Sequence, residues 1–266
     1  MVLASVSHEL RTPLNGSMAM LQTVIDDKRT PIGLIEMFLK PAVNSLKMLL
    51  TLVNDILDYS QINANKFRLV FQKVNLEKLI LDACSIVELQ AKNKEIDLEF
   101  EMDSKVNKAF STDPNRLTQI ILNLLSNAIK FTLQGKITIS CKLESKHPRR
   151  VRISVTDTGI GMKPEDVAKL FQSYTKIDLG DKATINSSGC GLGLNIANKL
   201  AMSLGKGEED HMQVISKEGQ GSTFTFFIED KAEVAQLALS EAKSGPINAN
   251  AYITPFDRKV LYGTEL

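Results

Sequence analysis

The stretch DPNRLTQIILNLLSNAIKFT, residues 113–132, has the pattern of an amphipathic helix with a marked beginning. Asp113 is of a type that caps helices, and Pro114 follows at the first helical position, where no intrahelical bond needs its missing N–H. Asn123, Asn127 and Lys130 then share one face, at i, i+4 and i+7. Amide oxygens there can enter a magnesium shell of water and phosphate, and the ammonium can reach a phosphate. If this helix is considered alone, the better interpretation is that its asparagines are structural and that neighbouring backbone groups satisfy their hydrogen bonds.

Strands and helices around this helix are mixed without strict alternation. Alternating or apolar runs predict strands at 67–71, 96–102, 137–143, 151–155 and 223–228, and helical periodicity predicts helices at 76–92, 114–131 and 192–204. This order favours an α/β sandwich of one sheet and helices over a doubly wound parallel sheet.

The motif DTGIGM, residues 157–162, directly follows a predicted strand. The carboxylate of Asp157 can accept a hydrogen bond from the exocyclic amine of a base. Gly159 and Gly161 let the backbone approach a ring without a side-chain clash. An ordinary glycine turn is the better interpretation of this motif in isolation.

A second glycine motif, SGCGLGLNIANKLA, spans residues 188–201 and opens a helix with Gly189, Gly191 and Gly193. Free amides at a helix start bind phosphate oxygens, aided by the helix dipole. The spacing fits neither the dinucleotide fingerprint nor the P-loop. The polar segment 172–188 before it suits a mobile lid over a nucleotide, with simple disorder as the alternative.

Residues 1–62 have a different, wholly helical pattern. Residues 26–33 form the natural turn, so two helices should fold back as an antiparallel hairpin, and Pro13 and Pro41 should each bend a helix. Each helix carries one apolar stripe that two helices alone cannot bury. A second copy of the hairpin would complete a four-helix bundle, which predicts a homodimer.

The motif SHELRTPLNG, residues 7–16, lies near the start of this hairpin. A neutral imidazole at His8 has a nitrogen lone pair able to attack phosphorus. Glu9 can hold the proton on the other ring nitrogen, and Thr12 lies one turn further on much the same face. A solvated histidine beside a charged neighbour is the better interpretation of a lone His-Glu pair.

Composition narrows the class of protein. The 266 residues contain 32 Lys and Arg against 31 Asp and Glu, so no global charge draws the chain to nucleic acid or an anionic membrane. Three cysteines without metal-type spacing indicate reduced thiols and a cytoplasmic location, which includes the cytosolic part of a membrane-bound protein. No apolar run approaches the roughly 20 residues that span a bilayer, so this segment should make no membrane contact.

Together and in this order, the motifs resemble those of the sensor histidine kinases of two-component systems, particularly the hybrid type, over roughly residues 3–230. SHELRTPLNG matches that family's phosphoacceptor motif, and the helix ending at Lys130 and Phe131 matches its asparagine box. DTGIGM and GCGLGL match its two glycine boxes. LFQSYTK, residues 170–176, resembles its phenylalanine box, and GQGSTFTFFI, residues 219–228, its closing strand.

The resemblance implies a role for each matching residue. His8 would be phosphorylated from ATP, Glu9 would be its general base, and the position of Thr12 would help to dephosphorylate a partner receiver. Asn127 would ligate Mg²⁺, and Phe171 would anchor the lid. At the nucleotide, the family places the residues that correspond here to Asn123, Asn127, Lys130, Phe131, Asp157, Gly159, Gly161, Phe171, Gly189, Gly191, Leu192, Gly193, Leu194 and Thr223.

The implied architecture is a dimerising and phosphoaccepting helical hairpin at 1–63, an ATP-binding domain at 67–230 and a tail or linker at 231–266. The second domain would have the sandwich fold shared with the gyrase and heat-shock-90 ATPases. The phosphoryl group would pass to an aspartate on a response-regulator receiver domain. Residues 205–214, GKGEEDHMQV, depart from the family by being more polar than its usual strand entry.

Two other functions fit part of the pattern. One is an ATPase or serine kinase on the same nucleotide fold, resembling the mitochondrial dehydrogenase kinases. The match to SHELRTP argues against it. A non-catalytic dimerisation scaffold has no need of Asn127, Asp157 and the glycines. The sequence therefore favours a protein histidine kinase over both.

Overall fold

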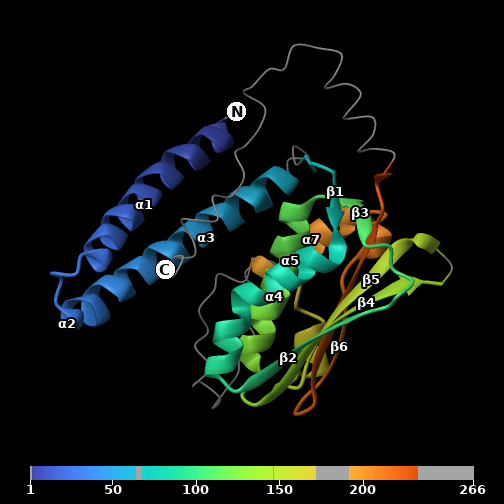
Figure 1. Cartoon of the computed structure of the whole chain (residues 1–266). Coiled ribbons are helices and arrows are strands. Elements are labelled where there is room, and N and C mark those ends of the chain that lie inside the picture. Colours follow the sequence, from blue (N-terminus) through green and yellow to red (C-terminus); the bar gives the residue numbers. More distant parts are fainter. Residues whose placement is uncertain (1, 64–67, 146, 172–191, 233–266) are drawn as a thin grey trace. The chain divides into compact units, whose positions relative to one another are not determined.

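A computed structural model of the chain describes residues 2–63, 68–145, 147–171 and 192–232. These residues fall into two compact units, the first containing Met1–Asn63 and the second Ala64–Ala238. The first unit is helical and the second combines helices with sheets (Figure 1). Within the described ranges, no helix combines the length and apolar character that a bilayer crossing requires.

The first unit is an antiparallel hairpin, as predicted (Figure 1). Helix α1, Val2–Asp26, packs against α3, Lys40–Asn63. The short helix α2, Ile32–Leu34, and a π-helix, Ile35–Leu39, lie between them. Helix α1 continues through Pro13.

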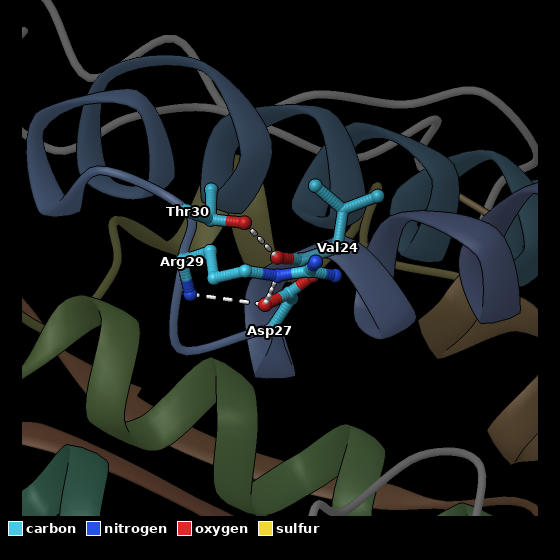
Figure 2. A network of polar contacts seen from close by, with 4 residues as sticks. All are labelled: Val24, Asp27, Arg29 and Thr30. Atoms are coloured by element: carbon cyan, nitrogen blue, oxygen red, sulfur yellow. Dashed lines mark hydrogen bonds and ion pairs between the residues drawn. The ribbon is translucent and has the colours of Figure 1, made fainter.

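A polar network closes the turn between the two long helices (Figure 2). The Thr30 hydroxyl donates to the carbonyl of Val24 at 2.7 Å. The Asp27 carboxylate accepts from the backbone N–H of Arg29 at 2.9 Å and from its guanidinium. Such local bonds satisfy backbone groups at a helix end and fix the direction in which the chain returns.

The helix is irregular immediately before Pro41. In the π-helix the N–H of Lys40 donates to the carbonyl of Ile35, five residues earlier. Proline cannot donate and crowds the preceding turn, and a widened turn accommodates both effects. The bends expected at Pro13 and Pro41 stay predictions, whereas the irregularity lies where proline chemistry requires one.

The second unit is an α/β sandwich built on a five-stranded sheet in the order β2-β4-β5-β7-β6. Strand β2, Ile96–Met102, runs parallel to β4, Gly135–Glu144, and the other neighbours are antiparallel. The remaining strands of the sheet are β5, His147–Asp157, β7, Gly221–Glu229, and β6, Gln213–Lys217. A separate pair joins β1, Gln72–Asn75, to β3, Ala109–Thr112.

Three helices cover one face of the large sheet (Figure 1). They are α4, Leu76–Asn93, α5, Pro114–Phe131, and α7, Gly193–Leu204. Every second residue of the central strands is buried beneath them, as Ile153 and Val155 are on β5. Asp157 continues this buried series, so a carboxylate lies on the helix-covered face.

Most predicted elements are confirmed, but the first strand was wrong. Residues 68–71 are not a strand, which begins only at Gln72, and residue 67 lies outside the described residues. The backbone N–H of Val70 instead donates to the Asp113 carboxylate at 2.8 Å, which ties this segment to the start of α5. Strands β3 and β6 and the short helix α6, Pro164–Val167, were not predicted.

Candidate functional site

Helix α5 supplies the asparagine-bearing face of the site. The buried Asp113 carboxylate caps the helix by accepting from the N–H groups of Asn115 and Arg116, each at 3.1 Å. The apolar face of α5 is buried in the core, and this fixes the rotation of the helix. Asn123, Asn127 and Lys130 are consequently half-buried at the edge of the core.

The two asparagines contact each other. Nδ2 of Asn127 donates to Oδ1 of Asn123 at 3.2 Å. This bond orients both amides and uses a donor of Asn127 and an acceptor of Asn123. Oδ1 of Asn127 is therefore the atom of the pair best suited to ligate a hard cation.

The start of α7 lies directly against Asn123. A Cβ added at Gly193 would overlap the Asn123 side-chain nitrogen, so glycine lets the helix start and this amide lie against each other. Leu192, the buried N-cap, provides no side-chain hydrogen bond, and the described first turn of α7 holds no acidic residue. Backbone amides of a helix start thus lie beside the asparagine face, where an anion is favoured.

Asp157 lies at the end of β5 and is only 6% exposed. Its Oδ1 accepts from the N–H of Gly159 at 2.9 Å, and the backbone N–H of Ser222 also donates to the carboxylate. Burial raises the pKa of the Asp157 carboxyl, and the two N–H groups partly offset the rise. The carboxylate is a strong acceptor held in a nearly water-free position.

The loop after Asp157 packs against the end of α5. The N–H of Ile160 donates to the carbonyl of Phe131 at 3.1 Å, and a Cβ at Gly159 would overlap that carbonyl. Gly161 has a φ of +61°, and a Cβ there would overlap the Lys217 carbonyl. Both glycines are therefore required by close backbone packing.

The last turn of α5 carries Lys130 and Phe131. The Lys130 ammonium lies 5.0 Å from the centroid of the Phe131 ring, and both side chains are half-buried. The ammonium of Lys94 donates to the carbonyl of Ile129 at 2.7 Å, which satisfies an end carbonyl of the helix. A cation contact of this kind also suits the negative end of the helix dipole.

Phe171 is held by the neighbouring helix. The side-chain Nδ2 of Asn195, in the first turn of α7, donates to the Phe171 carbonyl. Leu194 is half-buried in the same turn. Gly189, Gly191 and the predicted lid, 172–188, lie outside the described residues.

The strand register separates Thr223 from Asp157. Thr223 pairs with Thr156, and their hydroxyl oxygens are 3.1 Å apart. Neighbouring residues of a strand point to opposite faces, so Thr223 lies on the face away from the buried carboxylate. Ser222, which sequence reasoning missed, is the buried residue opposite Asp157.

The phosphoacceptor motif lies in the other unit. His8, Glu9 and Thr12 are in α1, and Thr12 is exposed. The side chains of His8 and Glu9 lie outside the part of the chain that the structure describes. The structure thus brings together Asn123, Asn127, Gly193, Phe131 and Gly159 within the second unit alone.

Two family models match separate parts of the chain. Residues 112–232 match the model described as histidine kinase-, DNA gyrase B-, and HSP90-like ATPase. Residues 1–65 match the model for the His Kinase A (phospho-acceptor) domain. The first range lies within the second unit, and the second range contains the helical hairpin.

Several curated proteins are similar over most of the chain. It is 38% identical over 232 residues to hybrid signal transduction histidine kinase B of Dictyostelium discoideum, covering 85% of this chain and 11% of that protein. It is 38% identical over 250 residues to the sensor protein GacS of Pseudomonas syringae pv. syringae, covering 89% of this chain and 26% of that protein. The chain therefore spans only 11% and 26% of the length of these relatives.

A solved structure is similar as well. Full-length ShkA in complex with AMPPNP aligns with a TM-score of 0.67 and 31% identity, over 85% of this chain and 45% of that one. The ligand in that crystal is an ATP analogue. The similarity includes both the fold and the sequence.

Proposed function

The chain belongs to the histidine kinases of two-component signalling, as the catalytic core of such a protein, and we propose that it phosphorylates its own His8 with ATP. One observation carries the proposal. Three elements meet at one corner of the sandwich: the asparagine face of α5, the start of α7 and the loop after Asp157. Each offers a group that suits one part of a nucleotide.

The base would bind at Asp157. A buried carboxylate that already accepts two backbone N–H groups retains lone-pair capacity for an exocyclic amine. Gly159 and Gly161 let the loop after Asp157 pack closely against the Phe131 and Lys217 carbonyls, which fixes the backbone beside the carboxylate. We therefore assign Asp157 to adenine recognition.

The phosphates would bind between α5 and α7. Asn127 Oδ1 would ligate Mg²⁺, with Asn123 orienting it through their mutual hydrogen bond. The bound ion would neutralise phosphate charge. Lys130 would contact a phosphate oxygen, and the first amides of α7 would face the anion.

Phosphoryl transfer requires a nucleophile outside this corner. A ring nitrogen of His8 would form the bond to the γ-phosphorus while the bond to the β,γ-bridging oxygen breaks and ADP leaves. Glu9 would hold the proton on the other ring nitrogen and so keep the attacking lone pair available. Positioning and charge neutralisation would supply most of the acceleration.

The phosphoryl group would then pass to an aspartate of a response-regulator receiver domain, and Thr12 would assist the later hydrolysis of that aspartyl phosphate. A homodimer would form through the hairpin, whose outer surface exposes apolar side chains. The cytoplasmic location also stays a prediction.

The test is transfer of labelled phosphate from ATP. We expect label on the wild-type chain that is labile in acid and stable in base, as for phosphohistidine, and no label when Mg²⁺ is chelated. His8→Gln should lose the label, whereas His147→Gln, the same change at an exposed histidine of the second unit, should keep it. Undiminished labelling of His8→Gln would refute the assignment, and an acid-stable label would favour phosphorylation of a hydroxyl group.

A further inference from the structure

The hydroxyl of Ser216, on β6, lies between the loop that follows Asp157 and the beginning of β7. The backbone N–H of Met162 donates to Ser216 Oγ at 2.9 Å. Ser216 Oγ lies 3.0 Å from the carbonyl oxygen of Gly221 and 2.9 Å from Ser222 Oγ. A single side chain thus contacts two backbone segments and a second hydroxyl.

The three contacts are mutually compatible. A hydroxyl has one hydrogen to donate and two lone pairs to accept with. The Ser216 hydrogen goes to the Gly221 carbonyl, and its lone pairs accept the Met162 N–H and the Ser222 hydroxyl hydrogen. The hydrogen-bonding capacity of Ser216 is therefore fully used inside the protein.

This network continues to the Asp157 carboxylate. Ser222, whose hydroxyl reaches Ser216, donates its backbone N–H to that carboxylate. The loop also binds the turn between β6 and β7 directly, since the Gly219 N–H donates to the Ile160 carbonyl at 2.7 Å. The other side of the loop is held by the end of α5.

Ser216 therefore connects the two segments that lie beside the Asp157 carboxylate. It fixes Met162 at the far end of the loop and Ser222 on the opposing strand. Without its hydroxyl, the Met162 N–H and the Ser222 hydroxyl would lose their shared partner. Both segments could then shift relative to Asp157, even though the fold remains.

We propose that Ser216 is a positioning residue for base recognition: its hydroxyl holds the loop and Ser222 so that Asp157 keeps the direction in which it accepts the exocyclic amine of adenine. This inference rests on the proposed function. It predicts that Ser216 sets selectivity for purine nucleotides that carry the amine. It touches no reacting atom and should leave the transfer step itself unchanged.

The test compares ATP with inosine triphosphate, in which a carbonyl oxygen replaces the amine, as substrates for labelling of the full chain. Ser216→Ala should raise the KM for ATP about threefold to tenfold, the effect of losing a hydrogen-bond network of this size, with kcat changed less than about twofold. The KM for inosine triphosphate should change less than about twofold. Ser216→Thr retains the hydroxyl and should recover most of the affinity for ATP.

Ser154→Ala is the matched control, because it removes a hydroxyl contact of 2.9 Å with Thr225 on the opposite face of the same sheet. It should leave both KM values unchanged. Equal effects of Ser216→Ala on both nucleotides, an unchanged KM for ATP, or a lowered melting temperature alone would overturn the inference while the proposed function stands. A wild-type chain that fails to use ATP would overturn both.

Discussion

Asp157 combines a buried position with an ionisable group, and this makes the stability of the protein depend on pH. Burial raises its folded-state pKa above the ordinary 3.8. A raised pKa stabilises the fold below the unfolded-state value, and this contribution is lost as the pH rises through the folded-state value. Asp157→Asn cannot ionise, so its melting temperature should increase relative to wild type as the pH rises from about 3.8 through the folded-state pKa of Asp157. ATP affinity should fall about tenfold to a hundredfold, as expected for a lost hydrogen bond to a charged group.

The control for this trend is Glu99→Gln. The hydrogen bond from Lys136 lowers the pKa of the exposed Glu99 carboxyl, which is the opposite shift. Wild type should therefore gain stability relative to Glu99→Gln as the pH rises through the titration of Glu99, by a small amount because solvent screens this pair. Parallel trends for the two variants in thermal unfolding would contradict the assignment of the Asp157 effect to burial.

Sequence reasoning reached Asp157 but named Thr223, and not Ser222, on the closing strand. Asp157 stands out because a carboxylate and two glycines directly follow an apolar strand. Which residue of β7 lies opposite it depends on the register, and a shift by one residue exchanges the two faces. Ser222 and Thr223 are both small hydroxyl residues, so their chemistry could not distinguish them before the pairing was known.

At the level of elements, a buried ion pair joins the start of β5 to the connection between α7 and β6. Arg150 binds Asp210, whose side chain is 1% exposed and also accepts from the Lys206 N–H at 2.8 Å. The guanidinium stacks on Phe227 at 4.1 Å. Asp210→Asn should lower the free energy of unfolding by about 3 kcal/mol or more, because it leaves a buried charge unpaired. Urea denaturation measures this.

The exposed pair between Lys136 and Glu99 provides the comparison. Its loss in Glu99→Gln at neutral pH should hardly change the urea midpoint, since water screens both charges. Equal effects of the two substitutions would show that the Arg150–Asp210 pair does not hold the connection in place.

This pair also accounts for the buried acidic residue within the polar stretch 205–214. The acidic side chain of Asp210 is turned inward, and the Met212 N–H is bound by Asn198 Oδ1 at 2.6 Å. Such long-range contacts leave no periodic pattern in the sequence.

Helix α5 was predicted to the residue because Asp113 and Pro114 mark its start locally, whereas β1, β3 and β6 have only four or five residues each. Alternation over so few residues is too weak a signal.

At the scale of the whole molecule, the hairpin has more apolar surface than its two helices bury. Leu50 and Leu57 of α3 are buried, but Leu49 and Ile56 are 47% and 52% exposed and lie seven residues apart on one side of the helix. We predict a homodimer formed by this side. Changing Leu49 and Ile56 together to lysine should yield a monomer in sedimentation velocity, since two charges would have to be buried at the interface.

The same variant tests whether nucleotide binding belongs to the sandwich alone. All the described contacts among the asparagines, Asp157 and the start of α7 lie within the second unit, so the monomer should bind ATP with wild-type affinity in calorimetry. Leu89→Lys, at a 69% exposed site on α4, is the matched control and should remain dimeric. A monomeric wild type would contradict the dimer. Loss of ATP affinity only on dissociation would mean that the second copy completes the nucleotide site, contrary to the contacts within one chain.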